Sequence, residues 1–243
     1  KFAWANPLHF DLFPRVRNME IEIIKMAKNM FQGGKQVCGN VTYGGTESIL
    51  LACKAYRDWG FHEKGITDPN IVILESGHSA FNKAGHYFNI NIKIVPTDDS
   101  GTSHFKLIES YIDSNTVCIV GSTPSYAHGI IDPIEKMSKL AEYYKIGLHV
   151  DCCMGGFLMP FVKDKLEIKY DFSLDGVTSI SADTHKYGYT FKGSSIILYK
   201  NPSYKKHQHF SQSDWNGGIY ATPTIMGSKS GALIATAWAA MLY

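Results

Sequence analysis

Four groups of polar residues stand beside apolar segments of the sequence, at points where side chains could do chemistry. Three groups follow a segment of the kind that forms a buried strand, and one precedes a helical segment. The groups are Gly44-Gly45-Thr46 before the helical segment, His78 after Ile71–Leu74, Asp151 after Ile146–Val150, and His185-Lys186 after Val177–Ile180. In an open α/β sheet the ligand binds beyond the carboxyl ends of the strands. These groups are therefore the first candidates for a functional site.

Each group taken alone has a simpler structural interpretation. A Gly44-Gly45 pair is more often a turn than a phosphate site, and a single His78 is more often a hydrogen-bonded structural residue. Lys186 alone would be a solvated surface lysine. Asp151 could cap a nearby segment, although a carboxylate at the end of an apolar strand is costly to bury without a cationic partner. The four groups fall at one edge of the predicted sheet, and this coincidence favours a shared function.

Together the groups match the needs of a phosphate-bearing aldehyde cofactor. Such a cofactor requires an anion site, a lysine to form an imine, an acid to keep a ring nitrogen protonated, and a flat side chain against the ring. We expect Thr46 to be the N-cap of a helix whose first N–H groups and dipole favour an anion. Lys186 is then the Schiff-base lysine and Asp151 the partner of the pyridinium nitrogen. The pattern predicts pyridoxal phosphate.

Other catalytic motifs fit the sequence less well. There is no GxSxG nucleophile motif, and the glycine segment 227–231 has the wrong spacing for a P-loop. His207 and His209 could supply two metal ligands but lack a third nearby, so no metal site is predicted. The adjacent thiols of Cys152 and Cys153 have poor geometry for a redox or zinc site. We expect them to be small buried side chains beneath the cofactor ring.

The composition is that of a globular protein. Of 243 residues 44% are hydrophobic, and 24 Lys and Arg balance 22 Asp and Glu without clustering, which argues against a nucleic-acid partner. Five cysteines without a CxxC pair argue against a disulfide framework and fit a reducing compartment. The sequence has no signal peptide and no apolar run of the ~18 residues needed to cross a bilayer. Because it starts without Met and stops in an apolar helical segment, we expect a soluble fragment of a longer chain.

Short apolar segments alternate with helical patterns along the chain. Helices are predicted over Pro14–Phe31 and over Glu47–Trp59, the second closed by Gly60. The predicted strands are Ile71–Leu74, Ile92–Val95, Val117–Val120, Ile146–Val150, Val177–Ile180 and Ser195–Tyr199, with further helices over Phe105–Ile112 and Pro133–Tyr144. Runs of Val and Ile separated by helices indicate an α/β fold with a mostly parallel sheet covered on both faces. The polar stretch Asn201–Asp214 is expected to be a mobile surface loop.

Longer strings of residues resemble a known family. The strings Ser181–Gly188, Gly44–Ser48 and His149–Asp151 are similar to the fold-type-I pyridoxal phosphate enzymes of the group II decarboxylase family. Within that family the chain most resembles the lyases of phosphorylated long-chain bases, through Asn6–His9 with Phe13-Pro14, Gly45–Asp58, His128–Pro133 and Asp214–Tyr220. The resemblance covers the whole chain. It implies that residues 1–243 form the large catalytic domain with part of its N-terminal segment, while an N-terminal anchor and a small C-terminal domain lie outside the chain.

The resemblance also implies a role for each site residue. Lys186 would carry the cofactor, Asp151 would contact its pyridine nitrogen, and His78 would stack on its ring. The residues implied to hold its phosphate are Gly44, Gly45, Thr46 and His185, and the candidates for the substrate phosphate are His9, Tyr126 and Lys192. The base that takes the proton from the substrate hydroxyl stays open between Lys186, a histidine and a water.

The implied activity is a carbon–carbon lyase of sphingolipid degradation. It would cleave a long-chain base phosphate such as sphingosine 1-phosphate to phosphoethanolamine and a fatty aldehyde. The resemblance further implies a homodimer in which Gly217-Gly218 reaches the neighbouring cofactor. It also implies an anchor in the endoplasmic reticulum membrane, with the catalytic part in the cytosol. An amino-acid decarboxylase of the same family is the alternative, and a non-catalytic protein that kept the fold is a third hypothesis, against which Lys186, Asp151 and His78 argue.

Three positions depart from the family pattern. Tyr43 stands where a small residue usually precedes the glycine pair, so we expect it to crowd or reshape the phosphate end. Cys152 replaces an alanine after Asp151 and is small enough to pack beneath the ring. Thr190-Phe191 replaces an Ala-Pro pair, which puts the geometry of Lys192 in doubt. None of the three departures removes a required chemical group.

Overall fold

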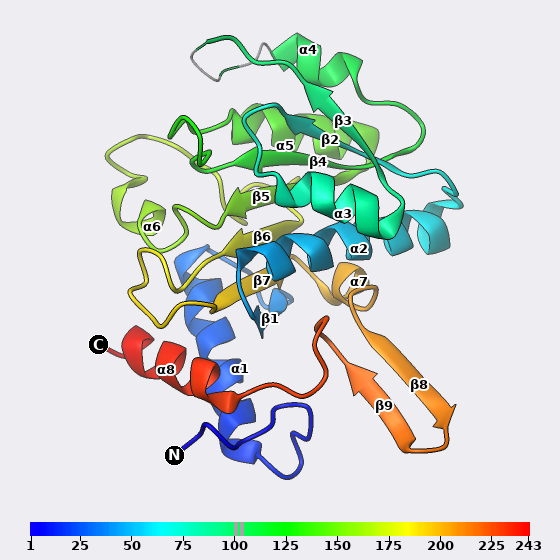
Figure 1. The fold of residues 1–243 in the computed structure, drawn as a ribbon. Helices are drawn as coiled ribbons and strands as arrows, with labels where there is room; N and C mark the ends of the chain where they lie inside the picture. Colours follow the sequence, from blue (N-terminus) through cyan, green and yellow to red (C-terminus); the bar gives the residue numbers. More distant parts are fainter. Residues whose placement is uncertain (100–101, 103–104) are drawn as a thin grey trace.

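The chain forms a seven-stranded sheet between two sets of helices, with a separate two-stranded hairpin (Figure 1). The computed structural model describes residues 1–99, 102 and 105–243. Its elements in chain order are α1 (Pro14–Met30), β1 (Cys38–Thr42), α2 (Gly45–Lys64), β2 (Asn70–Leu74), α3 (Ala80–Phe88), β3 (Asn91–Val95), α4 (Phe105–Ser110), β4 (Thr116–Ser122), α5 (Ile134–Tyr144), β5 (Gly147–Cys152), α6 (Met159–Val162), β6 (Ser179–Ala182), β7 (Ser195–Tyr199), α7 (Pro202–Lys205), β8 (Phe210–Trp215), β9 (Gly218–Thr222) and α8 (Gly231–Met241).

The strand order of the large sheet is β1-β7-β6-β5-β4-β2-β3. Only β7 runs antiparallel to its neighbours, β1 and β6, while the other paired strands are parallel. The carboxyl ends of six strands and the start of β7 therefore lie at one edge. In that register Asp151 at the end of β5 faces Ser122 of β4 on one side and Ser181 of β6 on the other.

Two apolar cores lie on the two faces of the sheet. One core joins the sheet to α2 and α3, and the other joins it to α1, α5 and α8. Every residue of β2, β4, β5, β6 and β7 is buried, as expected for strands covered on both sides. The six predicted strands are all present, and β7 has the predicted bounds. Strand β1 is an addition, and no helix of the described residues is long and apolar enough to cross a bilayer.

The start and the end of α2 both differ from the prediction. The N-cap is Gly44, with φ 108°, so Thr46 is an exposed residue of the first turn and caps nothing. Gly60 lies inside the helix, which continues to Lys64 and ends at Gly65 in the left-handed conformation. Position 60 has to be glycine because α2 lies close to β4 at this point. A Cβ atom there would lie 2.4 Å from Cγ1 of Val117 in β4.

The predicted loop over Asn201–Asp214 is also wrong. It contains the short helix α7, whose first turn is capped by the Asn201 side chain accepting from the Ser203 N–H at 3.0 Å, and most of β8. Strand β8 pairs antiparallel with β9, and the hairpin extends away from the sheet (Figure 1). Every residue of β8 is exposed, which explains why its sequence is polar and has no strand-like alternation.

We expect Gly60→Ala to lower the free energy of unfolding by about 1 kcal/mol. Alanine gains about 1 kcal/mol in helix propensity over glycine, but overpacking a filled contact costs about 1–3 kcal/mol, and here the contact is with the buried Val117. Urea unfolding measures the difference. Gly34→Ala is the matched control, because a Cβ atom at Gly34 meets nothing within 4 Å. A Gly60→Ala protein as stable as the parent would contradict the proposed contact.

Candidate active site

The loops that follow β1, β5 and β6 meet at the carboxyl edge of the sheet. A Cβ atom at Gly45 would lie 2.6 Å from Oδ1 of Asp183 and 2.9 Å from Sγ of Cys153. The residue therefore has to be glycine for the start of α2 to approach the other two loops. Gly45, Asp151 and Lys186, which sequence analysis selected from distant parts of the chain, are in this way brought to one place.

Lys186 is paired with a carboxylate that sequence analysis did not select. Its Nζ lies 3.0 Å from Oδ2 of Asp183, three residues earlier, and the Asp183 side chain is only 3% exposed. Burial acts to lower the pKa of Lys186, but attraction to Asp183, with smaller contributions from Cys153 and Asp151, raises it above its ordinary value. The lysine is thus held as a cation beside a buried acid. Asp183 lies within the string Ser181–Gly188, but nothing in that string indicates the pairing.

Asp151 is buried at the end of β5, and one of its carboxylate oxygens accepts two hydrogen bonds. Its Oδ1 accepts hydrogen bonds from the N–H of Cys153 at 2.9 Å and from the hydroxyl of Ser181 at 3.2 Å. Its Oδ2 has no hydrogen-bond partner among the residues that the structure describes. The thiols of Cys152 and Cys153 are buried beside it, as predicted, and burial raises the pKa of both. One acceptor of Asp151 is therefore available to a ligand.

The two predicted histidines have different surroundings. Nδ1 of His185 donates to the carbonyl oxygen of Ser194 at 2.6 Å, and its Nε2 lies 3.8 Å from Oδ2 of Asp183, so the ring is fixed at the Lys186 pair. His78 is half-buried in the loop after β2, where its Nδ1 accepts from the N–H of Ala80 at 3.0 Å. Within the described part of the chain, no hydrogen bond or ion pair joins His78 to Asp151 or Lys186.

The start of α2 has the features of an anion site. The N–H groups of Gly45 and Thr46 have no acceptor inside the helix, as in the first turn of any helix, and α2 is 20 residues long. Glu47 is buried and holds this turn, because its carboxylate accepts from the N–H of Tyr43 at 2.5 Å and from the N–H of Ile225 at 3.0 Å. The free donors of the turn are thus fixed in place.

The Tyr43 side chain contacts the segment before α8 and not the glycine turn that follows Tyr43 in the sequence. Its hydroxyl donates to the carbonyl oxygen of Ser230 at 2.5 Å, and its ring lies against the Lys229 ammonium, 5.4 Å from the ring centre. Burial is the main cause that raises the pKa of Tyr43 well above its ordinary value. The tyrosine therefore ties the turn before α2 to the segment that leads into α8.

The three residues predicted to bind a substrate phosphate are separate from this cluster. Tyr126 in the loop after β4 and Lys192 in the loop before β7 are exposed at the same edge of the sheet. His9 is exposed in the segment that precedes α1. Among the residues that the structure describes, no hydrogen bond or ion pair joins the three. The Thr190 hydroxyl near Lys192 lies 2.6 Å from the Ser194 hydroxyl, while Phe191 points into solvent and is 71% exposed.

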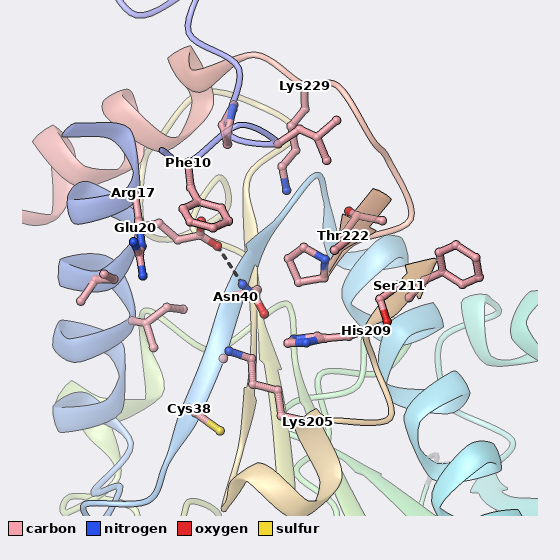
Figure 2. A pocket seen from close by; sticks show the side chains of 18 of the residues that line it. Phe10, Arg17, Glu20, Cys38, Asn40, Lys205, His209, Ser211, Thr222 and Lys229 are labelled. Carbon is pink, nitrogen blue, oxygen red and sulfur yellow. Dashed lines mark hydrogen bonds between the residues drawn. The ribbon is translucent and has the colours of Figure 1, made fainter. Parts of the chain in front are cut away.

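A cavity lies beside the segment that carries His9, whose neighbours Leu8 and Phe10 line it. It measures about 680 Å³ and is bounded by α1, β1, the hairpin and the segment before α8 (Figure 2). Arg17, Lys205, Lys229 and His209 line it, and the carboxylate of Glu20 accepts there from the Asn40 side chain at 3.1 Å. Sequence analysis missed this cavity, because its walls come from segments far apart in the chain. Within the described residues no cluster of three or more His, Cys, Asp or Glu is suited to a metal ion.

The sequence also matches a family of known proteins. Residues 3–213 match the family described as the pyridoxal-dependent decarboxylase conserved domain. The chain belongs to this family. In the pyridoxal-dependent decarboxylase family the cofactor is pyridoxal phosphate, which confirms the cofactor predicted from the sequence.

Relatives within the family include several lyases. Sphingosine-1-phosphate lyase 1 of Rattus norvegicus is 51% identical over 100% of this chain and 43% of its own length, and the lyase of Saccharomyces cerevisiae is 43% identical over 100% of this chain and 42% of its own length. The chain spans less than half the length of these curated relatives.

Two solved structures share the fold. A sphingosine-1-phosphate lyase of Burkholderia pseudomallei superimposes with a TM-score of 0.95 at 40% identity, over 99% of this chain and 58% of that one. Glutamate decarboxylase of Lactobacillus brevis gives 0.86 at 26% identity, over the same shares. Both likenesses confirm the predicted fold class, that of the fold-type-I pyridoxal phosphate enzymes.

The site fits pyridoxal phosphate by the chemistry of its unpaired groups. The first-turn N–H groups of α2 suit a phosphate, the amine of Lys186 suits an aldehyde, and Oδ2 of Asp151 can accept from a ring N–H. Oδ1 of Asp183 is buried without a partner in the described structure, so this carboxylate can still accept a hydrogen bond. An unsatisfied buried acceptor costs about 1–3 kcal/mol, which favours a ligand or water that donates to it.

We expect Asp183→Asn to lower the pKa of Lys186. Burial lowers this pKa, and the substitution removes the attraction to Asp183, the largest of the effects that raise it. Amine-reactive reagents attack the neutral lysine, so in the cofactor-free protein Lys186 should become reactive at lower pH, as measured by mass spectrometry of its peptide.

Asp175→Asn is the matched control for this measurement. It removes an exposed acid that lies 3.3 Å from Lys200, and it should leave the reactivity of Lys186 unchanged. A pH midpoint for Lys186 in Asp183→Asn that equals or exceeds that of the parent would contradict the assigned electrostatic effect.

Proposed function

We propose that the protein is a pyridoxal-phosphate-dependent carbon–carbon lyase. Its substrates are phosphorylated long-chain bases such as sphingosine 1-phosphate, and its products are phosphoethanolamine and a long-chain aldehyde. The observation that carries the proposal is the 43–51% identity to sphingosine-1-phosphate lyases along the whole chain, against 26% to glutamate decarboxylase. The cluster of Lys186, Asp183 and Asp151 supports it, since it can serve the cofactor that such a reaction requires.

The cofactor, when bound, supplies a ring that accepts electrons from a bond beside the substrate amine. Lys186 serves as the amine that tethers it. Asp183, 3.0 Å from that amine, attracts its proton and orients the side chain. Asp151 accepts from the ring nitrogen through the oxygen that has no protein partner, so the proton on the ring is retained.

The remaining residues of the edge bind and orient. The N–H groups of Gly45 and Thr46 would donate to the cofactor phosphate, with Gly44 shaping the turn and His185 as a further holder of that phosphate. His78 would stack on the ring. We place the substrate phosphate near Tyr126 and Lys192, whose exposure at the same edge leaves them accessible, with His9 as the third group. The base for the substrate hydroxyl is one of three candidates: the freed Lys186, a histidine, or a water.

An assay of the products tests the lyase against the decarboxylase. We expect the protein with pyridoxal phosphate to convert sphingosine 1-phosphate to a long-chain aldehyde and phosphoethanolamine, detected by mass spectrometry. We expect no carbon dioxide from glutamate or aromatic amino acids. Lys186→Arg should give no aldehyde above background, because it keeps the charge but cannot form the tether, whereas Lys139→Arg, at an exposed site on α5, should turn over as the parent does. If carbon dioxide is released and no aldehyde forms, the decarboxylase replaces the lyase as the proposed function.

We further infer that the protein is a homodimer built in part through the hairpin β8–β9. An isolated two-stranded hairpin is marginally stable in water, and this one exposes Phe210, Trp215 and Ile219, the last by 81%. Exposed apolar groups of this kind are typical of protein interfaces. We propose that Gly217 and Gly218, at its tip, reach the cofactor site of the second copy.

A charged substitution on the hairpin should weaken the dimer. We expect Ile219→Asp to shift the protein toward monomer in light-scattering chromatography, since burying an unpaired carboxylate costs several kcal/mol. Tyr143→Asp on α5 is the control, because Tyr143 is similarly exposed, by 77%, on a helix remote from the hairpin (Figure 1). A dimer that is equally stable in both variants would exclude the hairpin from the interface.

Residues 1–243 then correspond to the catalytic large domain of a longer protein. We propose that an anchor and a small C-terminal domain lie in the parts of the protein outside this chain. The anchor would place the protein at the endoplasmic reticulum membrane, with the catalytic domain in the cytosol. The chain spans 42–43% of the rat and yeast relatives, which leaves ample length for both parts.

A further inference from the structure

A row of buried polar side chains ends at Asp151. It runs from α2 through β6 and β5, and each member is hydrogen-bonded to the next. The members are Tyr56, Ser179, His149, Ser181 and Asp151, with successive distances of 2.6 Å, 2.7 Å, 3.0 Å and 3.2 Å. The first four are at most 1% exposed. Five polar groups in an apolar core are costly unless all are satisfied, so the row calls for an explanation.

The direction of each hydrogen bond follows from its end at Asp151. A carboxylate only accepts, so Ser181 donates its single proton to Oδ1 of Asp151. The Ser181 oxygen must then accept from Nε2 of His149, which therefore carries a proton. Burial lowers the pKa of His149 to about 4, so at neutral pH the ring has only that one proton.

The other half of the row continues in the same sense. Nδ1 of His149, without a proton, accepts from the hydroxyl of Ser179. The Tyr56 hydroxyl lies 2.6 Å from both the Ser179 and the Thr178 hydroxyl oxygens, and its single proton serves one of the two. The three bonds from Ser179 to Asp151 all donate toward Asp151, and aligned hydrogen bonds of this kind polarise and strengthen one another. The row therefore aims a hydrogen-bond donor at Oδ1 of Asp151.

We propose that Ser181 and His149 are positioning residues that fix the Asp151 carboxylate in place, with Oδ1 occupied and Oδ2 left for the cofactor ring nitrogen. The inference rests on the proposed function, which assigns Asp151 to that nitrogen. Ser181 acts directly on Oδ1 together with the N–H of Cys153. His149 acts through Ser181, because its Nε2–H donates to the Ser181 oxygen and turns the hydroxyl proton away from itself, toward Asp151.

The first measurement is the tautomer of His149. In protein labelled with ¹⁵N-histidine, we expect the nitrogen shifts of His149 to show a proton on Nε2 and none on Nδ1, in the cofactor-free and in the loaded protein. A proton on Nδ1 would reverse the direction of the row, and the inference would be abandoned.

The second measurement is the titration of the ring nitrogen in protein loaded with ¹⁵N-labelled pyridoxal phosphate. Ser181→Ala should move the loss of the ring proton up by roughly one pH unit, a tenfold change, because an Asp151 carboxylate that has lost one donor accepts more strongly from the ring N–H. Ser181→Thr should restore the parent titration. Ser138→Ala, another buried serine, which donates to Glu142 on α5, should not shift it. Should Ser181→Ala not fold, His149→Phe removes the donor to Ser181 and should shift the titration in the same direction.

Borohydride reduction of the loaded protein separates the two possible failures. A reduced adduct on Lys186 together with an unchanged ring titration in Ser181→Ala or His149→Phe would overturn this inference alone. Absence of the adduct in the parent protein would overturn the proposed function, and the inference with it.

Discussion

A buried carboxylate must be given hydrogen-bond donors, since its desolvation costs several kcal/mol if it is left alone. Asp151, 6% exposed, receives its donors from the alignment of β5 with β6, which sets Ser181 opposite it, and from the turn that brings back the N–H of Cys153. The same two strands end in the loops that carry Cys153 and Lys186. The parallel register that satisfies the acid is therefore also the register that assembles the site.

The fold was predictable because burial on both faces leaves a plain pattern in the sequence. Strands such as Ile71–Leu74 and Val117–Val120 are continuous apolar runs, and parallel strands between two layers of helices require such runs. Asp151 and Lys186 then stood out as polar residues at strand ends. Strand β1 was missed because Gly39 and Asn40 interrupt its apolar residues, and its strand character comes from pairing with β7.

The errors arose where a distant partner decides the local structure. Gly60 matches the signal for the end of a helix, yet it lies within α2. The residue there is glycine because Val117 leaves no room for a side chain. The hairpin residues gave no alternating pattern because β8 is exposed on both faces. Asp183 was overlooked for a related reason. The sequence shows that Asp183 and Lys186 are three residues apart. Only the folded loop shows that the carboxylate of Asp183 lies 3.0 Å from the amine of Lys186.

Asp151 has a buried side, toward the core, and an exposed side, toward the loops at the edge of the sheet, and the two have different surroundings. Behind it the row through Ser181 and His149 is sealed in the core against Phe81, where a change of volume or polarity is costly. In front of it the loops with Tyr126 and Lys192 are exposed and tolerate change more easily. A fold organised in this way can keep the position of the acid constant while the exposed loops vary in sequence. The fold is accordingly shared with a glutamate decarboxylase at 26% identity, while the relatives at 43–51% are sphingosine-1-phosphate lyases.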